Sequence, residues 1–75
     1  MQTFTFTPTG NQVCDAWLSA VAARLPTLTQ AEQGRWLDDL LSDMRPTKRI
    51  DAFAIAHASL TLGHWQDIAA HRIAA

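Results

Sequence analysis

Two residue–proline pairs divide this chain into segments, and the segments that follow residue 10 have apolar residues at the spacing of helices. Leu25-Pro26 and Arg45-Pro46 are expected to end helices, because the residue before a proline is pushed out of the α region. Between the two pairs, Thr29-Gln30-Ala31-Glu32 forms a capping box, in which the threonine hydroxyl and the glutamate carboxylate each satisfy an orphan backbone N–H group. The sequence therefore predicts an all-α fold, a small bundle of three to four short helices.

The first helix is predicted over residues 11–25. Asn11 is a suitable N-cap, and Asp15 lies in the first turn, where the helix dipole favours a negative charge. Apolar residues at helical spacing are expected to form its buried stripe, which consists of Val13, Trp17, Ala20, Val21 and Leu25, with Cys14 and Leu18 beside it.

The second helix is predicted to begin at the capping box and to end before Arg45-Pro46. Its expected apolar face consists of Trp36, Leu37, Leu40, Leu41 and Met44. Trp17, Trp36 and Trp65 each begin a similar apolar series at helical spacing, so the three rings are expected to share one core.

Residues 47–74 leave two alternatives open. Thr47 is a suitable cap for a third helix that is apolar nearly all round, with one stripe of Ile50, Phe53, His57 and Leu60 and another of Ala52, Ile55, Ala56, Ser59 and Leu62. A break at Gly63 would give a short fourth helix over residues 64–73, which would bury Trp65, Ile68, Ala69 and Ile73. Glycine disfavours a helix without forbidding it, so one long rod is the alternative.

The first ten residues are predicted to form an extended N-terminal arm. Thr3-Phe4-Thr5-Phe6-Thr7 alternates like a strand before Pro8 and Gly10 stop it, and nothing else in the sequence has a strand pattern. The arm either packs Phe4 and Phe6 onto the helices or pairs as a short β-strand with a second copy or with a partner's sheet edge.

Composition indicates a single small helical domain over residues 1–75. The 75 residues are 48% hydrophobic and carry a net charge of −1, which is enough apolar material for one small core. The single cysteine cannot form an internal disulfide, and no signal peptide or membrane span is evident in the sequence. These features favour a cytoplasmic protein.

No constellation of residues indicates catalysis or metal binding. Cys14 lies beside an apolar stripe and has no base near it in sequence, and the three glycines are scattered. His57, His64 and His71 are spaced by seven residues, about 10 Å along a helix, which is too far to share a metal ion. Asp67 could contact His64 and His71 and raise their pKa values. The sequence therefore predicts no enzyme, no cofactor and no metal site.

The acidic residues of the second helix and the surplus of apolar residues on the third instead favour a protein-binding module. Such a module would act as a regulator, adaptor or inhibitor of a larger assembly, for example in a bacterium or a phage. The predicted partner-binding residues are Glu32, Asp38, Asp39 and Asp43 on the second helix, Ile55 on the third, and Phe4 and Phe6 on the arm. The apolar circumference of the third helix exceeds what one neighbouring face covers, so we expect either a central position in the monomer or a homodimer through this helix. The alternative is a helix-turn-helix DNA-binding regulator with its turn at Gly63 and phosphate contacts from Arg45, Lys48 and Arg49, although the net negative charge disfavours nucleic acid.

Overall fold

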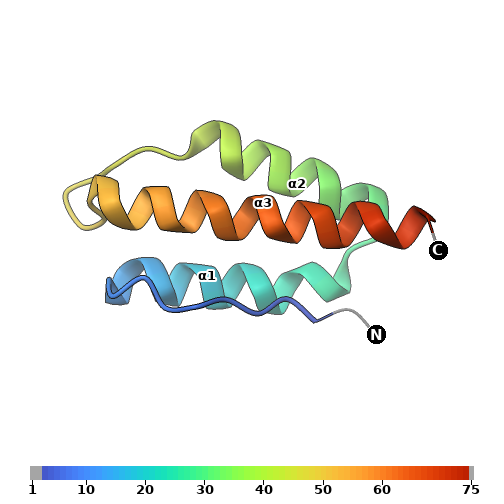
Figure 1. Cartoon of the computed structure of the whole chain (residues 1–75), viewed down its shortest axis with the longest axis horizontal. Coiled ribbons are helices and arrows are strands. Elements are labelled where there is room, and N and C mark those ends of the chain that lie inside the picture. The colour runs from blue at the N-terminus through green and yellow to red at the C-terminus, as the bar shows by residue number, and fades with distance from the viewer. Residues whose placement is uncertain (1–2, 75) are drawn as a thin grey trace.

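Three α-helices and an extended arm make up the computed structural model, which describes residues 3–74, with side chains for residues 3–70. The elements are α1 (Gln12–Arg24), a 3-10 turn (Leu25–Thr27), α2 (Gln30–Asp43) and α3 (Ala52–Ala74). In Figure 1, α3 lies between α2 and α1, and the arm runs along α1. The all-α prediction is confirmed, and residues 3–74 contain no strand.

The N-terminus of α1 follows the prediction, but the buried side of the helix is different. Asn11 Oδ1 accepts a hydrogen bond from the backbone N–H of Cys14 at 3.0 Å. The buried residues are Cys14, Leu18, Val21 and Leu25, whereas Val13 is 44% exposed, Ala20 is exposed and Trp17 is half-buried. Val21 and Leu25 of the predicted stripe are therefore buried together with Cys14 and Leu18, and Cys14 Sγ lies 3.9 Å from the carbonyl oxygen of Ala54 on α3.

The capping box at the start of α2 is confirmed. Thr29 Oγ1 accepts from the backbone N–H of Glu32 at 3.3 Å, and Glu32 Oε1 accepts from that of Thr29 at 2.9 Å. Leu37 is buried, and the rest of the predicted face packs partly buried against the core. The sequence did not indicate that Gln33 would be fully buried. Its Nε2 donates to the carbonyl oxygen of Leu25 at 2.8 Å, which ties α2 to the preceding turn.

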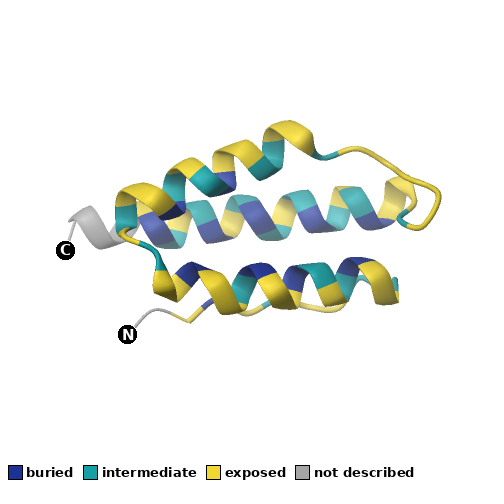
Figure 2. Cartoon of the chain, turned by 180° about the vertical axis from the view of Figure 1, so that it is seen from behind, coloured by how far each residue is buried: buried dark blue, intermediate teal, exposed yellow. Residues whose placement is uncertain are grey.

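Residues 52–74 form one continuous helix without a break at Gly63, so the structure adopts the rod, which begins five residues later than predicted. Thr47 does not cap it: the Thr47 hydroxyl accepts from the N–H groups of Arg49 and Ile50 within the loop. Asp51 takes the capping role, because its Oδ1 accepts from the N–H of Ala54 at 2.8 Å. The buried stripe of α3 consists of Ala54, Ala58, Leu62, Trp65 and Ala69 and alternates with exposed residues (Figure 2). The predicted burial of Trp65 and Ala69 is confirmed. Neither of the two stripes predicted for the first part of the helix matches the buried one, apart from Leu62, because an all-round apolar helix does not specify which side is buried.

Trp65 is the centre of the core and the docking point of the arm. The rings of Phe4 and Phe6 meet the Trp65 ring edge to face, with centroids 6.1 and 6.2 Å away. Trp65 Nε1 donates to the carbonyl oxygen of Thr5 at 2.9 Å. The arm therefore packs its phenylalanines onto the helices, as one of the two interpretations predicted.

The other two tryptophans do not share this core. Trp17 and Trp36 are half-buried at its edge, and the guanidinium carbon of Arg24 lies 5.7 Å from the centroid of the Trp36 ring. Of the three tryptophan rings, only that of Trp65 is fully buried. Among residues 3–74, no helix is both long and apolar enough to cross a bilayer.

Acid is expected to weaken the junction between the arm and α1. Asp15 Oδ1 accepts hydrogen bonds from the backbone N–H and the hydroxyl of Thr9, each at 2.8 Å, and these hold the pKa of Asp15 below its ordinary value of 3.8. Stability contributed by a lowered pKa is present above the ordinary value and is lost as the pH falls through the folded value.

The test is urea unfolding of the wild type and of Asp15→Asn between about pH 5 and about pH 2. The two free energies of unfolding should differ at the higher pH and converge as acid neutralises the wild-type carboxylate. A difference that stayed constant across this range would contradict a charge-dependent role for Asp15.

Candidate functional site

The side of α3 that faces away from its buried stripe is the most exposed apolar surface among the described side chains. We call it the outer face of α3, and it consists of Ala52, Phe53, Ala56, Leu60, Gly63 and His64. Phe53 is 77% exposed and Leu60 is 78% exposed, and the two lie two helical turns apart on one face. A single exposed leucine needs no explanation, but two large apolar side chains in register form a patch.

The outer face of α3 carries no formal charge. Residues 52–66 contain no Asp, Glu, Lys or Arg, so the first charged side chain of the helix is Asp67. A solvated helix face normally carries charged residues opposite its buried stripe. The outer face of α3 instead consists of apolar side chains and the imidazole of one histidine.

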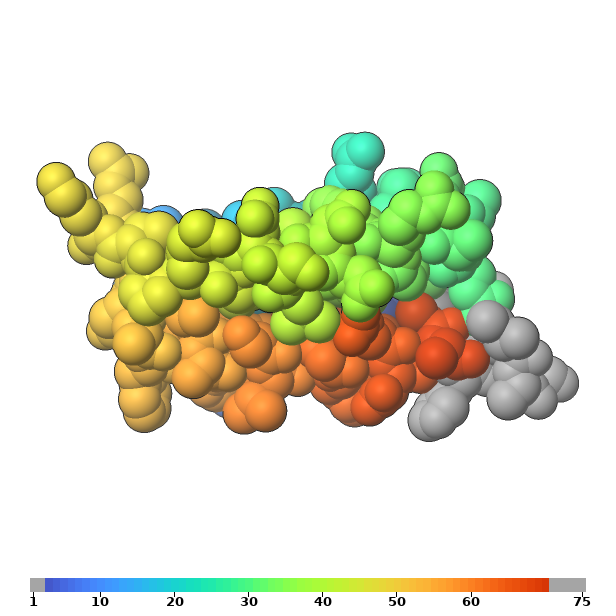
Figure 3. Space-filling model, turned by 90° about the horizontal axis from the view of Figure 1, so that it is seen from above, coloured from blue at the N-terminus to red at the C-terminus, as the bar shows by residue number. Residues whose placement is uncertain are grey.

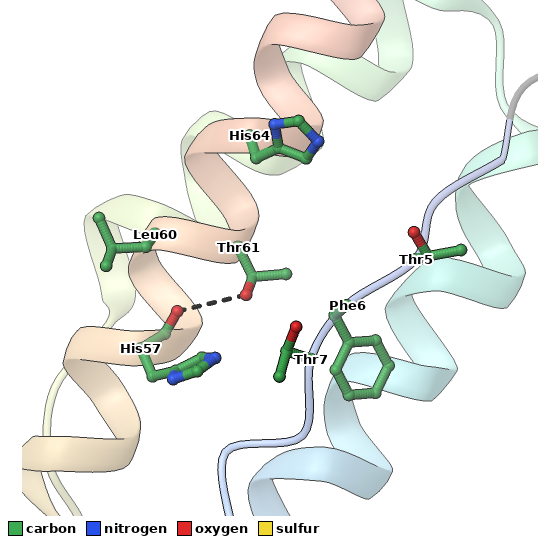
Figure 4. Close-up of a pocket in the computed structure, with 7 residues that line it drawn as sticks. All are labelled: Thr5, Phe6, Thr7, His57, Leu60, Thr61 and His64. Carbon is green, nitrogen blue, oxygen red and sulfur yellow. Dashed lines mark hydrogen bonds between the residues drawn. The ribbon is translucent and has the colours of Figure 1, made fainter.

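A groove of about 420 Å³ lies between α3 and the arm, beside the outer face. Figure 4 shows His57, Thr61 and His64 on the side of α3 nearer the arm, whereas Leu60 points away from the arm. The Thr61 hydroxyl donates to the carbonyl oxygen of His57 at 3.3 Å. His57 and His64 are two turns apart, too far to share one ligand atom. The groove is lined by threonine hydroxyls and imidazoles together with Phe6 and Leu60, so it extends the outer face with a mixed polar and apolar surface.

The four predicted acidic residues of α2 do not act as one group. Glu32 is engaged in the capping box, and the backbone and side chain of Thr29 lower the pKa of its carboxyl group. Asp38 turns toward α3 and accepts a hydrogen bond from Gln66 Nε2 at 2.8 Å. Figure 3 shows α2 and α3 side by side, as this contact requires.

Asp39 and Asp43 remain exposed on α2 and are the two predicted acids without a structural role among the contacts described here. An Arg45 nitrogen lies 4.0 Å from Asp43 Oδ1, but both side chains are largely exposed, so this ion pair contributes little. Arg24 and Arg35 line the same hollow as Asp39. The acidic surface is therefore limited in extent and lies beside basic side chains.

The predicted apolar partner-binding residues lie in three different environments. Phe4 is only 7% exposed and belongs to the core, so it is not accessible while the arm is docked. Phe6 is half-buried against Trp65. Ile55 is half-buried in a hollow of about 220 Å³ at the end of the bundle, together with Val13, Trp17, Met44 and Ile50.

Phe53 and Leu60 were not among the predicted partner-binding residues. The sequence had placed both on an apolar stripe with Ile50 and His57, but that stripe could equally have been the buried one. The four-residue repeat of Ala54, Ala58 and Leu62 was the signal that could have oriented the helix, because small residues permit close helix packing.

Cys14 shows none of the features of a nucleophile. Its thiol is 1% exposed, and burial raises its pKa above the ordinary value of 9.0. Among the side chains of residues 3–70, no group of three His, Cys, Asp or Glu could hold a metal ion. The predicted contact of Asp67 with His71 lies outside the described side chains.

The basic residues Arg45, Lys48 and Arg49 are exposed on the loop between α2 and α3. The carbonyl oxygen of Arg49 accepts a hydrogen bond from Asn11 Nδ2 at 2.8 Å, which fixes the loop to the start of α1. Gly63, the predicted turn of a helix-turn-helix, lies inside α3 instead. No protein-family model, curated protein or solved structure matches this chain.

Proposed function

We propose that this chain is a small non-enzymatic protein-binding module, of the kind that regulates, adapts or inhibits a larger assembly, and that it binds through the outer face of α3. The exposure of Phe53 and Leu60 on a helix face without formal charge carries this proposal. Full burial of a side chain of this size is worth roughly 1.5–3 kcal/mol. A partner that covered both would gain a substantial part of a binding free energy.

The shape and chemistry of this face favour a protein over other classes of ligand. A helix ridge encloses no small molecule, since small-molecule sites bury most of the ligand in a concave pocket. A face without Lys or Arg offers nothing to a phosphate backbone. An apolar helix face suits another helix or an apolar groove.

A second, weaker surface is the pair of exposed carboxylates on α2. Asp39 and Asp43 are four residues apart and repel each other by a few tenths of a kcal/mol in the free helix. A basic partner would relieve this repulsion, and association through them would slow as salt screens the charges.

Affinity capture with the purified full chain as bait, together with sedimentation of the bait itself, tests the proposal. Replacing Phe53 and Leu60 with serine should abolish the protein–protein interactions of the wild type. The matched control replaces Ala20 and Ala23, exposed on α1, with serine and should bind normally. The Asp39→Lys/Asp43→Lys double variant should weaken only the part of the partner capture that depends on salt concentration. Unchanged capture and unchanged self-association in the Phe53→Ser/Leu60→Ser chain would refute the proposal.

DNA binding is the second candidate function, and the exposure of three basic side chains on one loop is the observation that favours it. Mobility shift of duplex DNA at two salt concentrations tests it, because phosphate contacts weaken steeply with salt. A salt-sensitive shift that was lost on replacing Lys48 and Arg49 with alanine would support this candidate over protein binding.

A further inference from the structure

We infer that the N-terminal arm is exchangeable between copies of this chain: the arm of one copy can dock on Trp65 of a second copy, and the turn at Gly10 keeps it on its own chain. This inference goes beyond the proposed function, because it concerns the surface around Trp65 and not the outer face of α3. Its basis is that the contacts that dock the arm and the contacts that turn the chain are made by different residues.

The contacts that dock the arm are made by residues 4–6. The rings of Phe4 and Phe6 pack against the ring of Trp65, and the carbonyl oxygen of Thr5 accepts a hydrogen bond from Trp65 Nε1. Phe4 is 7% exposed, so the docked arm buries a whole aromatic ring. These contacts form equally well whichever copy carries the arm. The surface around Trp65 therefore recognises an extended segment with aromatic residues two positions apart.

The contacts that turn the chain are made by residues 9–15. The arm and α1 run in opposite directions, so the chain reverses between them (Figure 1). Gly10 lies at this reversal with a φ of 91°, in the left-handed region that residues with a Cβ atom disfavour. Thr9 donates two hydrogen bonds to Asp15 Oδ1, and its hydroxyl oxygen accepts a third from the N–H of Asn11 at 3.1 Å. These contacts stabilise the reversed form of the chain.

Opening the turn gives the arm a second place to dock. When Gly10 becomes extended, the arm continues away from the start of α1 instead of folding back along it. A two-fold axis through two opened turns then places each arm along α1 of the other copy, with its phenylalanines on that copy's Trp65. The arm enters the second copy from the same end as that copy's own arm, and every contact occurs twice. Such an exchange of identical elements is a low-cost route to a dimer.

The balance between the two forms depends chiefly on the turn, because both forms bury the same arm residues. In the wild type, the hydrogen bonds of Thr9 and the glycine at position 10 favour the reversed form. A segment on a short linker is also present at its own site at an effective concentration on the order of millimolar. We therefore expect the wild type to exchange its arm only above about 1 mM.

Gly10→Ala is the main test, because it weakens the reversed form and leaves the docking contacts unchanged. A residue with a Cβ atom in the left-handed region disfavours the reversed form about tenfold per chain, and so about a hundredfold for the two chains of a dimer. Sedimentation should therefore show self-association about a hundredfold tighter than that of the wild type. Gly34→Ala is the matched control, since a Cβ atom there meets nothing within 4 Å and its φ is not positive. It should sediment like the wild type.

Asp15→Ala tests the turn without changing the residue at position 10. It removes the acceptor of both hydrogen bonds that Thr9 donates, and these bonds exist only in the reversed form. It should therefore also shift the chain toward the dimer, and its combination with Gly10→Ala should shift the equilibrium further. Far-ultraviolet circular dichroism checks that each variant keeps its helices.

Isotope-filtered NMR then identifies the copy to which each docked arm belongs. Isotope-labelled and unlabelled Gly10→Ala chains are unfolded together and refolded at about 500 μM. An exchanged arm should give nuclear Overhauser effects between the Phe4 ring of the unlabelled copy and the Trp65 indole of the labelled copy. The same mixture of wild-type chains should give none, because each arm stays on its own chain.

Two results would overturn arm exchange. One is a Gly10→Ala chain that keeps its helices and stays monomeric at about 500 μM. The other is a dimer in which the contact of Phe4 with Trp65 remains within one chain. Adding Phe53→Ser and Leu60→Ser to Gly10→Ala should leave the exchanged dimer intact, since exchange does not use the outer face of α3. A failure of arm exchange is therefore distinguishable from a failure of the proposed function.

Discussion

Replacing Trp65 with alanine is expected to remove a large part of the stability of this fold. The side chain is fully buried, its ring contacts both phenylalanines of the arm, and its indole N–H binds the backbone of the arm. Truncating a buried tryptophan to alanine typically costs about 3–5 kcal/mol. The whole free energy of unfolding of a chain of this length is roughly 4–11 kcal/mol. Urea unfolding followed by far-ultraviolet circular dichroism should therefore show a sharply lowered midpoint.

Trp65→Phe separates the contribution of the ring from that of the hydrogen bond. This variant keeps an aromatic ring in the core but lacks the donor to the carbonyl oxygen of Thr5. Its loss should be smaller than that of Trp65→Ala, since a lost hydrogen bond alone costs on the order of 1 kcal/mol. Equal effects of the two substitutions, or a loss below about 1 kcal/mol for alanine, would contradict the central role of the ring.

The local signals in the sequence predicted the local structure well. Asn11 caps α1, and Thr29 with Glu32 caps α2, because a cap is a contact between residues three apart and needs no tertiary information. The end of α2 likewise lies before Pro46. These signals determine where helices start and stop.

Which side of each helix is buried could not be predicted in the same way. Apolar residues surround α3, so periodicity did not distinguish the stripe of Ala54, Ala58 and Leu62 from that of Phe53 and Leu60. Which stripe is buried depends on how closely two helices approach each other. Cys14 of α1 packs against the backbone of Ala54 where α1 and α3 approach each other. Thr47 and Asp51 were both chemically able to cap α3, and the path of the loop determines that Asp51 does so.

The candidate site was hard to predict for the same reason. Asp38 was expected on the solvated side of α2, but it accepts a hydrogen bond from Gln66 on α3. Glu32 was expected both to cap α2 and to face a partner, and its capping contact with Thr29 is confirmed. Phe4 appeared available to a partner, but it is part of the core. Phe53 and Leu60 became candidates only once the buried side of α3 was known.

Removing the arm is the second change expected to have a large effect. Phe4 is nearly fully buried, and burial of an aromatic ring contributes roughly 1.5–3 kcal/mol. Deleting residues 1–8 should therefore lower the free energy of unfolding by up to about 3 kcal/mol, because the cost of ordering the arm offsets part of the gain from burial. It should also leave the indole N–H of Trp65 without its acceptor on Thr5, so hydrogen exchange at that group should accelerate.

Point variants show which residues of the arm are responsible for its docking. Phe4→Ala should approach the effect of the deletion without exceeding it, because an arm that loses its anchor can undock rather than leave a cavity. Phe6→Ala should have a smaller effect, since Phe6 is half-buried, and Thr3→Ala and Thr7→Ala should have almost none, since both threonines are exposed. If the deletion changed neither stability nor indole exchange but abolished partner binding, the arm would be a binding element and not part of the core.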